Sequence, residues 1–134
     1  MVDFQGESRR WLEQARRDLD DARFCAGGNR YNLACFLCQQ AAEKALKAYL
    51  YAQGNPVVWG HSVDELCRQS ATTDPDFDDL RTRVRKLDRF YIPTRYPNGL
   101  PGGLPADSFD ETDATQALDL TQETIEFVEA HLAS

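Results

Sequence analysis

Apolar residues recur at steps of three and four along most of this chain, the spacing that places side chains on one face of an α-helix. The first stripe of this kind covers residues 8–26 and ends at Gly27-Gly28. The next segment, residues 31–53, is apolar around most of its circumference and ends before Gly54-Asn55-Pro56. These two segments therefore predict a pair of long helices joined by a short turn.

Three further helices are predicted by their start signals. Ser62 and Glu65 have the spacing of a capping box, which predicts a short helix ending at about Gln69. Asp74-Pro75 precedes a stripe that extends to Tyr91, so we expect a helix of about sixteen residues there. The last helix is expected to begin at Asp110 or Thr112 and to run to about Leu132, with acidic residues in its first turn.

Strand-like alternation of apolar and polar residues is missing from the sequence, because its one β-rich run, Val57-Val58-Trp59, is too short for a sheet. We therefore predict an all-α fold, an antiparallel up-and-down bundle of four long helices plus one short helix. At 134 residues the chain is expected to form a single domain, residues 1–134. The unusually apolar helix at 31–53 has two interpretations: another subunit covers it, or the first helix wraps it tightly.

The stretch at 87–105, LDRFYIPTRYPNGLPGGLP, reads as a long loop stiffened by prolines. A loop of this length that contains an arginine and two tyrosines suggests a binding site, although a lid that only covers the bundle would share the pattern. Arg95 could bind a phosphate through two parallel hydrogen bonds, and Tyr91 and Tyr96 could stack on a base. Alternatively, Arg95 pairs with an acid of the first or last helix and clamps the loop.

Charge is spread unevenly along the chain. The net charge of −7 argues against a protein that coats nucleic acid nonspecifically. Residues 81–95 nevertheless contain six basic residues against one acid, a local charge of +5, while the remainder carries −12. Such a patch suits a single compact anion, or it is a solvated helix face beside acidic neighbours. Neither a membrane span nor the features of a signal peptide are recognisable, so we expect a cytoplasmic protein without a membrane-bound part.

Cysteine and histidine residues are few, and their positions predict neither a metal site nor a cofactor. The four cysteines lie within helical patterns, so we expect reduced, buried thiols rather than disulfides or a zinc site. His131 falls in the last turn of the final helix and is interpreted as structural or solvated. His61 could act as a general base or a phosphate ligand, or could simply hydrogen-bond to the bundle.

Four segments together resemble the HEPN domain, a nucleotide-binding domain of higher eukaryotes and prokaryotes. They are AAEKALKAYL at 41–50, GHSVDEL at 60–66, LDRFYIPTRYPNGLP at 87–101 and DATQALDLTQETIEFVEAHL at 113–132. The resemblance implies a compact helical domain, commonly a homodimer, often encoded beside a minimal nucleotidyltransferase as a toxin–antitoxin pair. It also assigns six residues to motif positions of the family: Lys44, His61, Tyr91, Arg95, Tyr96 and Pro97.

Many HEPN domains are metal-independent ribonucleases that use an arginine followed four to six residues later by a histidine. This sequence lacks that spacing, because neither His61 nor His131 follows an arginine closely. We therefore favour a non-catalytic HEPN homodimer that binds a nucleotide or phosphate-bearing ligand and acts with a minimal nucleotidyltransferase. Two alternatives stay open: a ribonuclease toxin with a non-standard active site that uses Arg95 and His61, and a dimerisation module whose partner-facing surface is the second helix.

Overall fold

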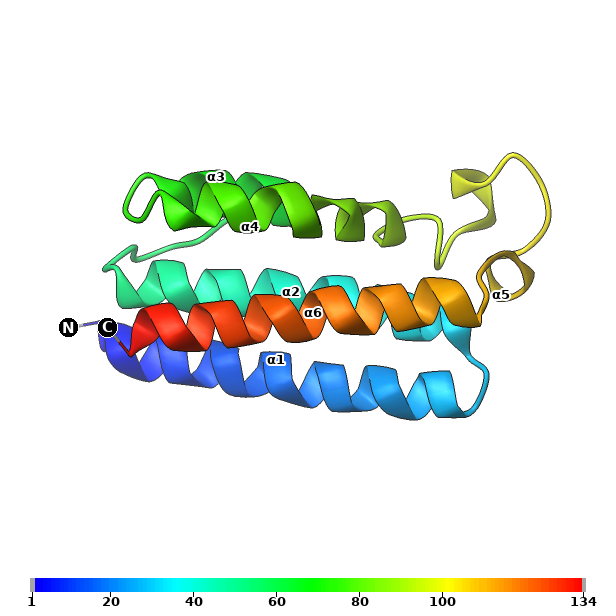
Figure 1. Cartoon of the computed structure of the whole chain (residues 1–134), viewed down its shortest axis with the longest axis horizontal. Coiled ribbons are helices and arrows are strands. Elements are labelled where there is room, and N and C mark those ends of the chain that lie inside the picture. Colours follow the sequence, from blue (N-terminus) through cyan, green and yellow to red (C-terminus); the bar gives the residue numbers. More distant parts are fainter. Residues whose placement is uncertain (1, 134) are drawn as a thin grey trace.

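Three long helices form one layer of the molecule (Figure 1). In the computed structural model, which describes residues 2–133, these are α1 (Phe4–Gly27), α2 (Tyr31–Ala52) and α6 (Glu111–Leu132). The α1 helix begins four residues earlier than the apolar stripe predicts, because the Asp3 carboxylate accepts the Gly6 amide at 2.9 Å and caps an additional turn. Asp110 caps α6 in the same way, and Asp113 completes a capping box there.

A second layer of shorter helices lies over α2 and α6 and runs roughly parallel to them (Figure 1). It consists of α3 (Val63–Ala71) and α4 (Asp76–Val84), which the 3₁₀-helix η1 (Arg85–Phe90) continues. The loop that follows contains two more short turns, η2 (Pro97–Gly99) and α5 (Pro105–Ser108). Every regular element within residues 2–133 is helical, which confirms the all-α fold, and none of these helices is long and apolar enough to cross a membrane.

The continuous helix predicted up to Tyr91 is the main difference between expectation and structure. The α-helix ends at Val84, and the chain tightens into 3₁₀ geometry as far as Phe90. Val84, Leu87 and Phe90 follow one another at steps of three and are all buried, which suits a helix with three residues per turn. Phe90 therefore takes the buried position that the stripe assigned to Tyr91, and Tyr91 is left half-buried at the surface.

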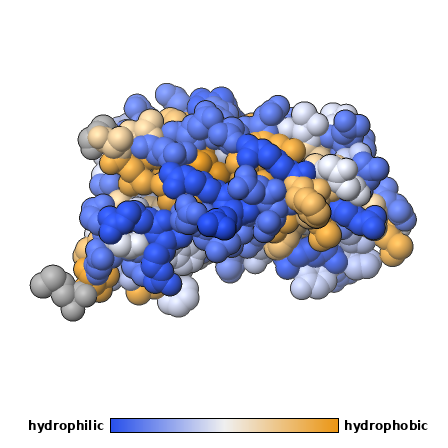
Figure 2. All heavy atoms as spheres, turned by 90° about the horizontal axis from the view of Figure 1, so that it is seen from below, coloured by the Kyte–Doolittle hydropathy of each residue, from blue (hydrophilic) through white to orange (hydrophobic). Residues whose placement is uncertain are grey.

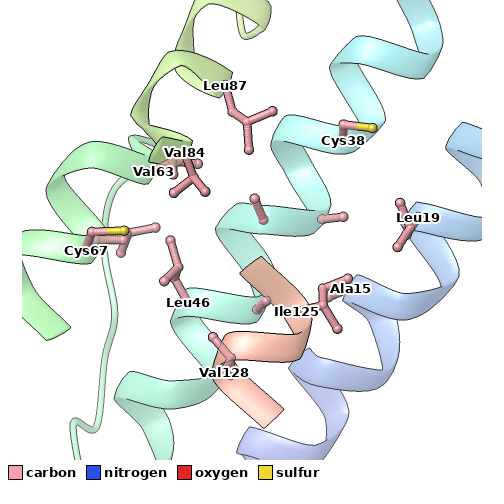
Figure 3. Packing of buried hydrophobic residues seen from close by; sticks show 14 of the residues in the cluster. Ala15, Leu19, Cys38, Leu46, Val63, Cys67, Val84, Leu87, Ile125 and Val128 are labelled. Atoms are coloured by element: carbon pink, nitrogen blue, oxygen red, sulfur yellow. The ribbon is translucent and has the colours of Figure 1, made fainter. Parts of the chain in front are cut away.

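The hydrophobic core surrounds α2 (Figure 3). Leu46, in the second half of this helix, is fully buried and points toward the layer that contains Val84 of α4 (Figure 3). The alanines and cysteines of α2 are equally buried, and their small size lets α1 and α6 approach closely. Most of the apolar surface of α2 is thus covered within the chain, so it gives no support to the second helix as the surface of a dimerisation module.

The outward face of the bundle below α2 is largely hydrophilic (Figure 2), in keeping with the charged positions of α1. All four thiols are free, and Cys35, Cys38 and Cys67 are fully buried as predicted, whereas Cys25 is only half-buried. Burial raises the pKa of Cys35, Cys38 and Cys67 to about 12 in each case. These thiols are therefore protonated core side chains at neutral pH.

Candidate functional site

Arg95 lies among three aromatic rings in the loop after η1. Its guanidinium carbon is 4.3 Å from the centre of the Phe36 ring on α2, and 5.0 Å from the ring centres of both Tyr91 and Tyr96. Nε and Nη2 both donate to the Tyr91 carbonyl, at 3.0 and 2.8 Å. These contacts hold a half-buried cation in one place, since cation–π attraction strengthens as water is excluded.

Within residues 2–133, no acidic side chain neutralises this guanidinium. None of the ion pairs formed in that range includes Arg95, and its Nη1 group donates no hydrogen bond there. The alternative in which Arg95 pairs with an acid of the first or last helix is therefore not observed. By contrast, Arg81 and Arg83 are paired with Asp64 and Glu123, so part of the basic segment is neutralised within the chain.

The loop that carries Arg95 is anchored to the bundle just before this residue. Thr94 is fully buried, and its hydroxyl donates to the Phe90 carbonyl. Asn32 on α2 donates to the Thr94 carbonyl at 3.1 Å. Farther along, the chain folds back so closely that a Cβ on Gly99 would lie 3.0 Å from the Cα of Pro93. The loop is therefore a packed structure that fixes the backbone of Arg95.

His61 also contacts the ring of Tyr91. Their rings stack with centres 5.4 Å apart and planes inclined by 16°. Gly60, in the left-handed region at φ 102°, turns the chain just before it. His61 Nδ1 is 2.9 Å from Glu43 Oε1, so the proton lies on Nδ1 when the ring is neutral, and Nε2 can accept a hydrogen bond. The side chain is 63% exposed, so this nitrogen is accessible to a ligand.

Glu43 is a buried carboxylate at the centre of a polar network on α2. Besides His61, it accepts from Lys47 Nζ at 3.0 Å and from Gln40 Nε2 at 3.2 Å. Lys47 is also buried and lies 5.4 Å from the Trp11 ring centre. A buried carboxylate is costly unless it is paired, and these donors offset that cost. The network consequently holds the Glu43 carboxylate in place, and this carboxylate orients the His61 ring through Nδ1.

Asp88 on η1 holds the start of α3 and so the chain beside His61. Its carboxylate accepts four hydrogen bonds, from Ser62 Oγ at 2.9 Å, Val63 N at 2.7 Å, Asp64 N at 3.0 Å and, more distantly, Gln39 Nε2 at 3.5 Å. Two free amides of the α3 N-terminus are thereby satisfied by a carboxylate from a neighbouring element. The position of His61 therefore depends on η1 as well as on α2.

The predicted site residues divide into two groups. Tyr91, Arg95, Tyr96 and His61 form a continuous row through ring contacts, and Pro97 begins η2 next to Tyr96. Lys44 makes its contact elsewhere: its ammonium is 2.6 Å from Asp18 Oδ2 on α1. Among the described residues, no hydrogen bond, ion pair or ring contact joins Lys44 to these four residues, so we define the Arg95 row as Tyr91, Arg95, Tyr96 and His61.

Comparison with known proteins identifies the family of the chain. The HEPN domain model matches residues 8–131. The chain belongs to the HEPN domain family. Among solved structures, the protein TT1696 from Thermus thermophilus is 43% identical with a TM-score of 0.82, the alignment covering 92% of this chain and 97% of that one. ST0689, an archaeal HEPN homologue, is 36% identical with a TM-score of 0.78, covering 94% and 98%.

A HEPN domain protein from Thermotoga maritima is 28% identical with a TM-score of 0.74, covering 92% of this chain and 98% of that one. Human Sacsin is 29% identical over 126 residues, which are 86% of this chain but 3% of the Sacsin length. This HEPN domain therefore spans a small fraction of that relative. Its likeness to the three structures extends over nearly the whole of each.

Sequence reasoning missed several residues that build the site of this HEPN domain. Phe36 is one of many apolar residues on α2, and the sequence gives no sign that its ring contacts the Arg95 guanidinium. Glu43 did carry a signal, since a carboxylate within a helix that is apolar almost all round needs a partner. Asp88 is visible in the sequence as the one acid of the basic segment, but nothing in the sequence indicates that it caps another helix. Thr94 gave no signal, because its burial depends on the path of the loop.

Proposed function

We propose that this HEPN domain binds a nucleotide or another phosphate-bearing ligand at the Arg95 row without transforming it. The observation that supports the proposal is a half-buried guanidinium that rests on three rings and has no acidic partner in the described part of the chain. An arginine used only to clamp the loop would be expected to face a carboxylate. This one keeps an N–H edge that a phosphate can take without breaking an ion pair.

The neighbours of Arg95 suit the remainder of a nucleotide. Tyr96 is 50% exposed, so a base can stack on its outer face, an interaction worth about 1–3 kcal/mol. His61 would offer Nε2 to a hydroxyl or, when protonated, an additional charge to the phosphate. We leave Lys44 out of the proposed site, because its ammonium would have to give up Asp18 first.

The proposed biological setting is that of a cytoplasmic homodimer acting with a minimal nucleotidyltransferase, in the manner of a toxin–antitoxin pair. It is supported by membership of the HEPN family, whose members are often encoded beside such enzymes. A small nucleotidyltransferase reading frame next to this gene would support it. Co-expression followed by affinity purification would test it directly, and failure of the two proteins to copurify would count against this partner.

Calorimetry with ATP and AMP, each up to millimolar concentration, tests the binding site. We expect Arg95→Ala to weaken binding by at least about tenfold, because a charge-assisted hydrogen bond is worth roughly 1.5–3 kcal/mol. Arg95→Lys should recover only part of this, since an ammonium lacks the planar pair of donors. Arg17→Ala is the matched control: this arginine is 72% exposed on α1 and should leave affinity unchanged.

Helical circular dichroism measured for each variant separates lost binding from lost structure. Because Arg95 contacts its own loop and one ring of α2, its removal should leave the helical signal nearly intact. A wild-type protein that binds neither nucleotide at millimolar concentration contradicts the proposal. So does an Arg95→Ala variant that binds as tightly as the wild type.

A metal-independent ribonuclease is the second candidate, and one observation favours it. His61 is oriented by a buried carboxylate while its other nitrogen is accessible, the geometry of a general base, and Arg95 contacts the same tyrosine ring. Incubating the protein with a folded RNA in the presence of a chelator tests this function. Cleavage that His61→Ala abolishes would establish it, whereas an intact RNA leaves the binding function as the better account.

A further inference from the structure

At the end of the bundle away from the Arg95 row, the fold brings together three side chains that are far apart in sequence. His131 is in the last turn of α6, while Asp74 and Asp76 flank Pro75 at the start of α4. His131 Nε2 lies 3.3 Å from Asp76 Oδ2 and 3.5 Å from Asp74 Oδ2, and the three atoms all lie within 4.8 Å of one another.

We propose that Asp74, Asp76 and His131 form a binding site for a divalent transition-metal ion, of which Zn²⁺ is the best match. Nitrogen and oxygen ligands of Zn²⁺ lie about 2.0–2.2 Å from the ion, so at tetrahedral angles two of them are about 3.4 Å apart. The two distances from Nε2 have this value without any rearrangement. An imidazole ligand favours Zn²⁺ over Mg²⁺ or Ca²⁺, which prefer oxygen ligands alone.

The histidine ring is prepared for this role by its surroundings. His131 Nδ1 is 2.8 Å from the Phe127 carbonyl, which can only accept, so the proton lies on Nδ1 and the lone pair of the neutral ring on Nε2. The ring stacks on Phe127, with centres 4.0 Å apart, and meets the buried Phe77 edge-on at 5.4 Å. A metal-binding histidine is commonly oriented in this way, through a hydrogen bond from its other nitrogen.

The two carboxylates are similarly placed to donate one oxygen each. Asp74 Oδ1 accepts the Asp76 amide at 3.0 Å, which holds the Asp74 side chain and leaves Oδ2 toward His131. The Asp76 side chain is 69% exposed, so water can complete the coordination of the ion from the solvent side. The bound ion would fasten the C-terminal turn of α6 to the first turn of α4, and so join the two layers.

The same atoms could form only an ion pair between a protonated His131 and the two acids. Metal-stripped protein titrated with Zn²⁺ in a calorimeter distinguishes the two cases. We expect one ion per chain, and an affinity at least about tenfold weaker in Asp76→Asn and in His131→Gln, each of which removes one ligand. Asp78→Asn is the matched control: it removes an exposed acid of the same turn and should bind as the wild type does.

The melting temperature gives an independent test of the same site. Zn²⁺ should raise the melting temperature of the wild type and of His61→Asn, but not that of Asp76→Asn, since an ion bound only to the folded state stabilises it. If His131→Gln is poorly folded, the test rests on Asp76→Asn alone. The Asp76 side chain is mostly exposed, so its replacement should not disturb folding. Zn²⁺ binding that is absent at millimolar concentration, or unchanged in Asp76→Asn, overturns the proposal and leaves the ion pair.

Discussion

Replacing Asp88 by alanine provides the most direct test of how this HEPN domain positions His61. The carboxylate accepts one hydroxyl and two backbone amides at 2.7–3.0 Å, and no other side chain of residues 2–133 takes those two amides. An N-terminal cap is worth about 1 kcal/mol and a hydrogen bond to a charged group about 1.5–3 kcal/mol, while water partly compensates at this half-buried position. We therefore expect a loss of about 3 kcal/mol in the free energy of unfolding.

Urea denaturation followed by circular dichroism measures this loss, and for a chain of this size it corresponds to a fall of about 10 °C in melting temperature. Ser62→Ala is the companion variant, expected to cost about 1 kcal/mol. Because Ser62 and Asp88 share a hydrogen bond, the double variant should lose less than the sum of the two single losses. A loss below about 1 kcal/mol in Asp88→Ala, or strict additivity, would refute the reasoning.

Three further predictions follow from other parts of the structure. Iodoacetamide at pH 8 should label the half-buried Cys25 alone in native protein, whereas mass spectrometry after denaturation should find four labels. Although burial opposes it, hydrogen bonds from Arg81 and Arg68 lower the pKa of Asp64. The contribution of the Asp64 carboxylate to stability is therefore present at neutral pH and lost as pH falls below about 4. The difference in free energy of unfolding between wild type and Asp64→Asn, measured with urea, should accordingly become smaller below that pH. Leu46→Ala should cost about 2–5 kcal/mol in urea unfolding, and a cost below about 1 kcal/mol would contradict its central burial.

The helices could be predicted from the sequence because each is marked by local signals. Apolar steps of three and four identified the buried faces, and Asp110 and Ser62 marked starts that the structure confirms. The 3₁₀ segment could not be foreseen in the same way, since steps of three at Val84, Leu87 and Phe90 also fit an α-helix. Only packing against α2 and α3 decides between the two geometries.

The loop residues of the candidate site could be predicted from the sequence, whereas the helix residues that hold them in place could not. Arg95 and its tyrosines stand in a stretch unlike the remainder of the chain, so the sequence alone drew attention to them. Phe36 reaches Arg95 from a helix more than fifty residues away in the sequence, and Glu43 of the same helix reaches His61; both contacts depend on how the layers are packed. The position of the Lys44 side chain depends likewise on its ion pair with Asp18 of α1. Because α1 contains several acidic residues, the sequence alone does not indicate which of them pairs with Lys44.

Enclosure of α2 by the other helices has a consequence for how such a domain can diversify. Most positions on this helix between Ala34 and Leu50 are buried, so substitutions there destabilise the fold. Ile92, Tyr96 and Leu104, in contrast, lie in an exposed segment that can vary in sequence without disturbing the interior. At the proposed binding site, different ligand preferences would therefore arise by exchange of loop side chains, while the sequence of the buried helix stays the same.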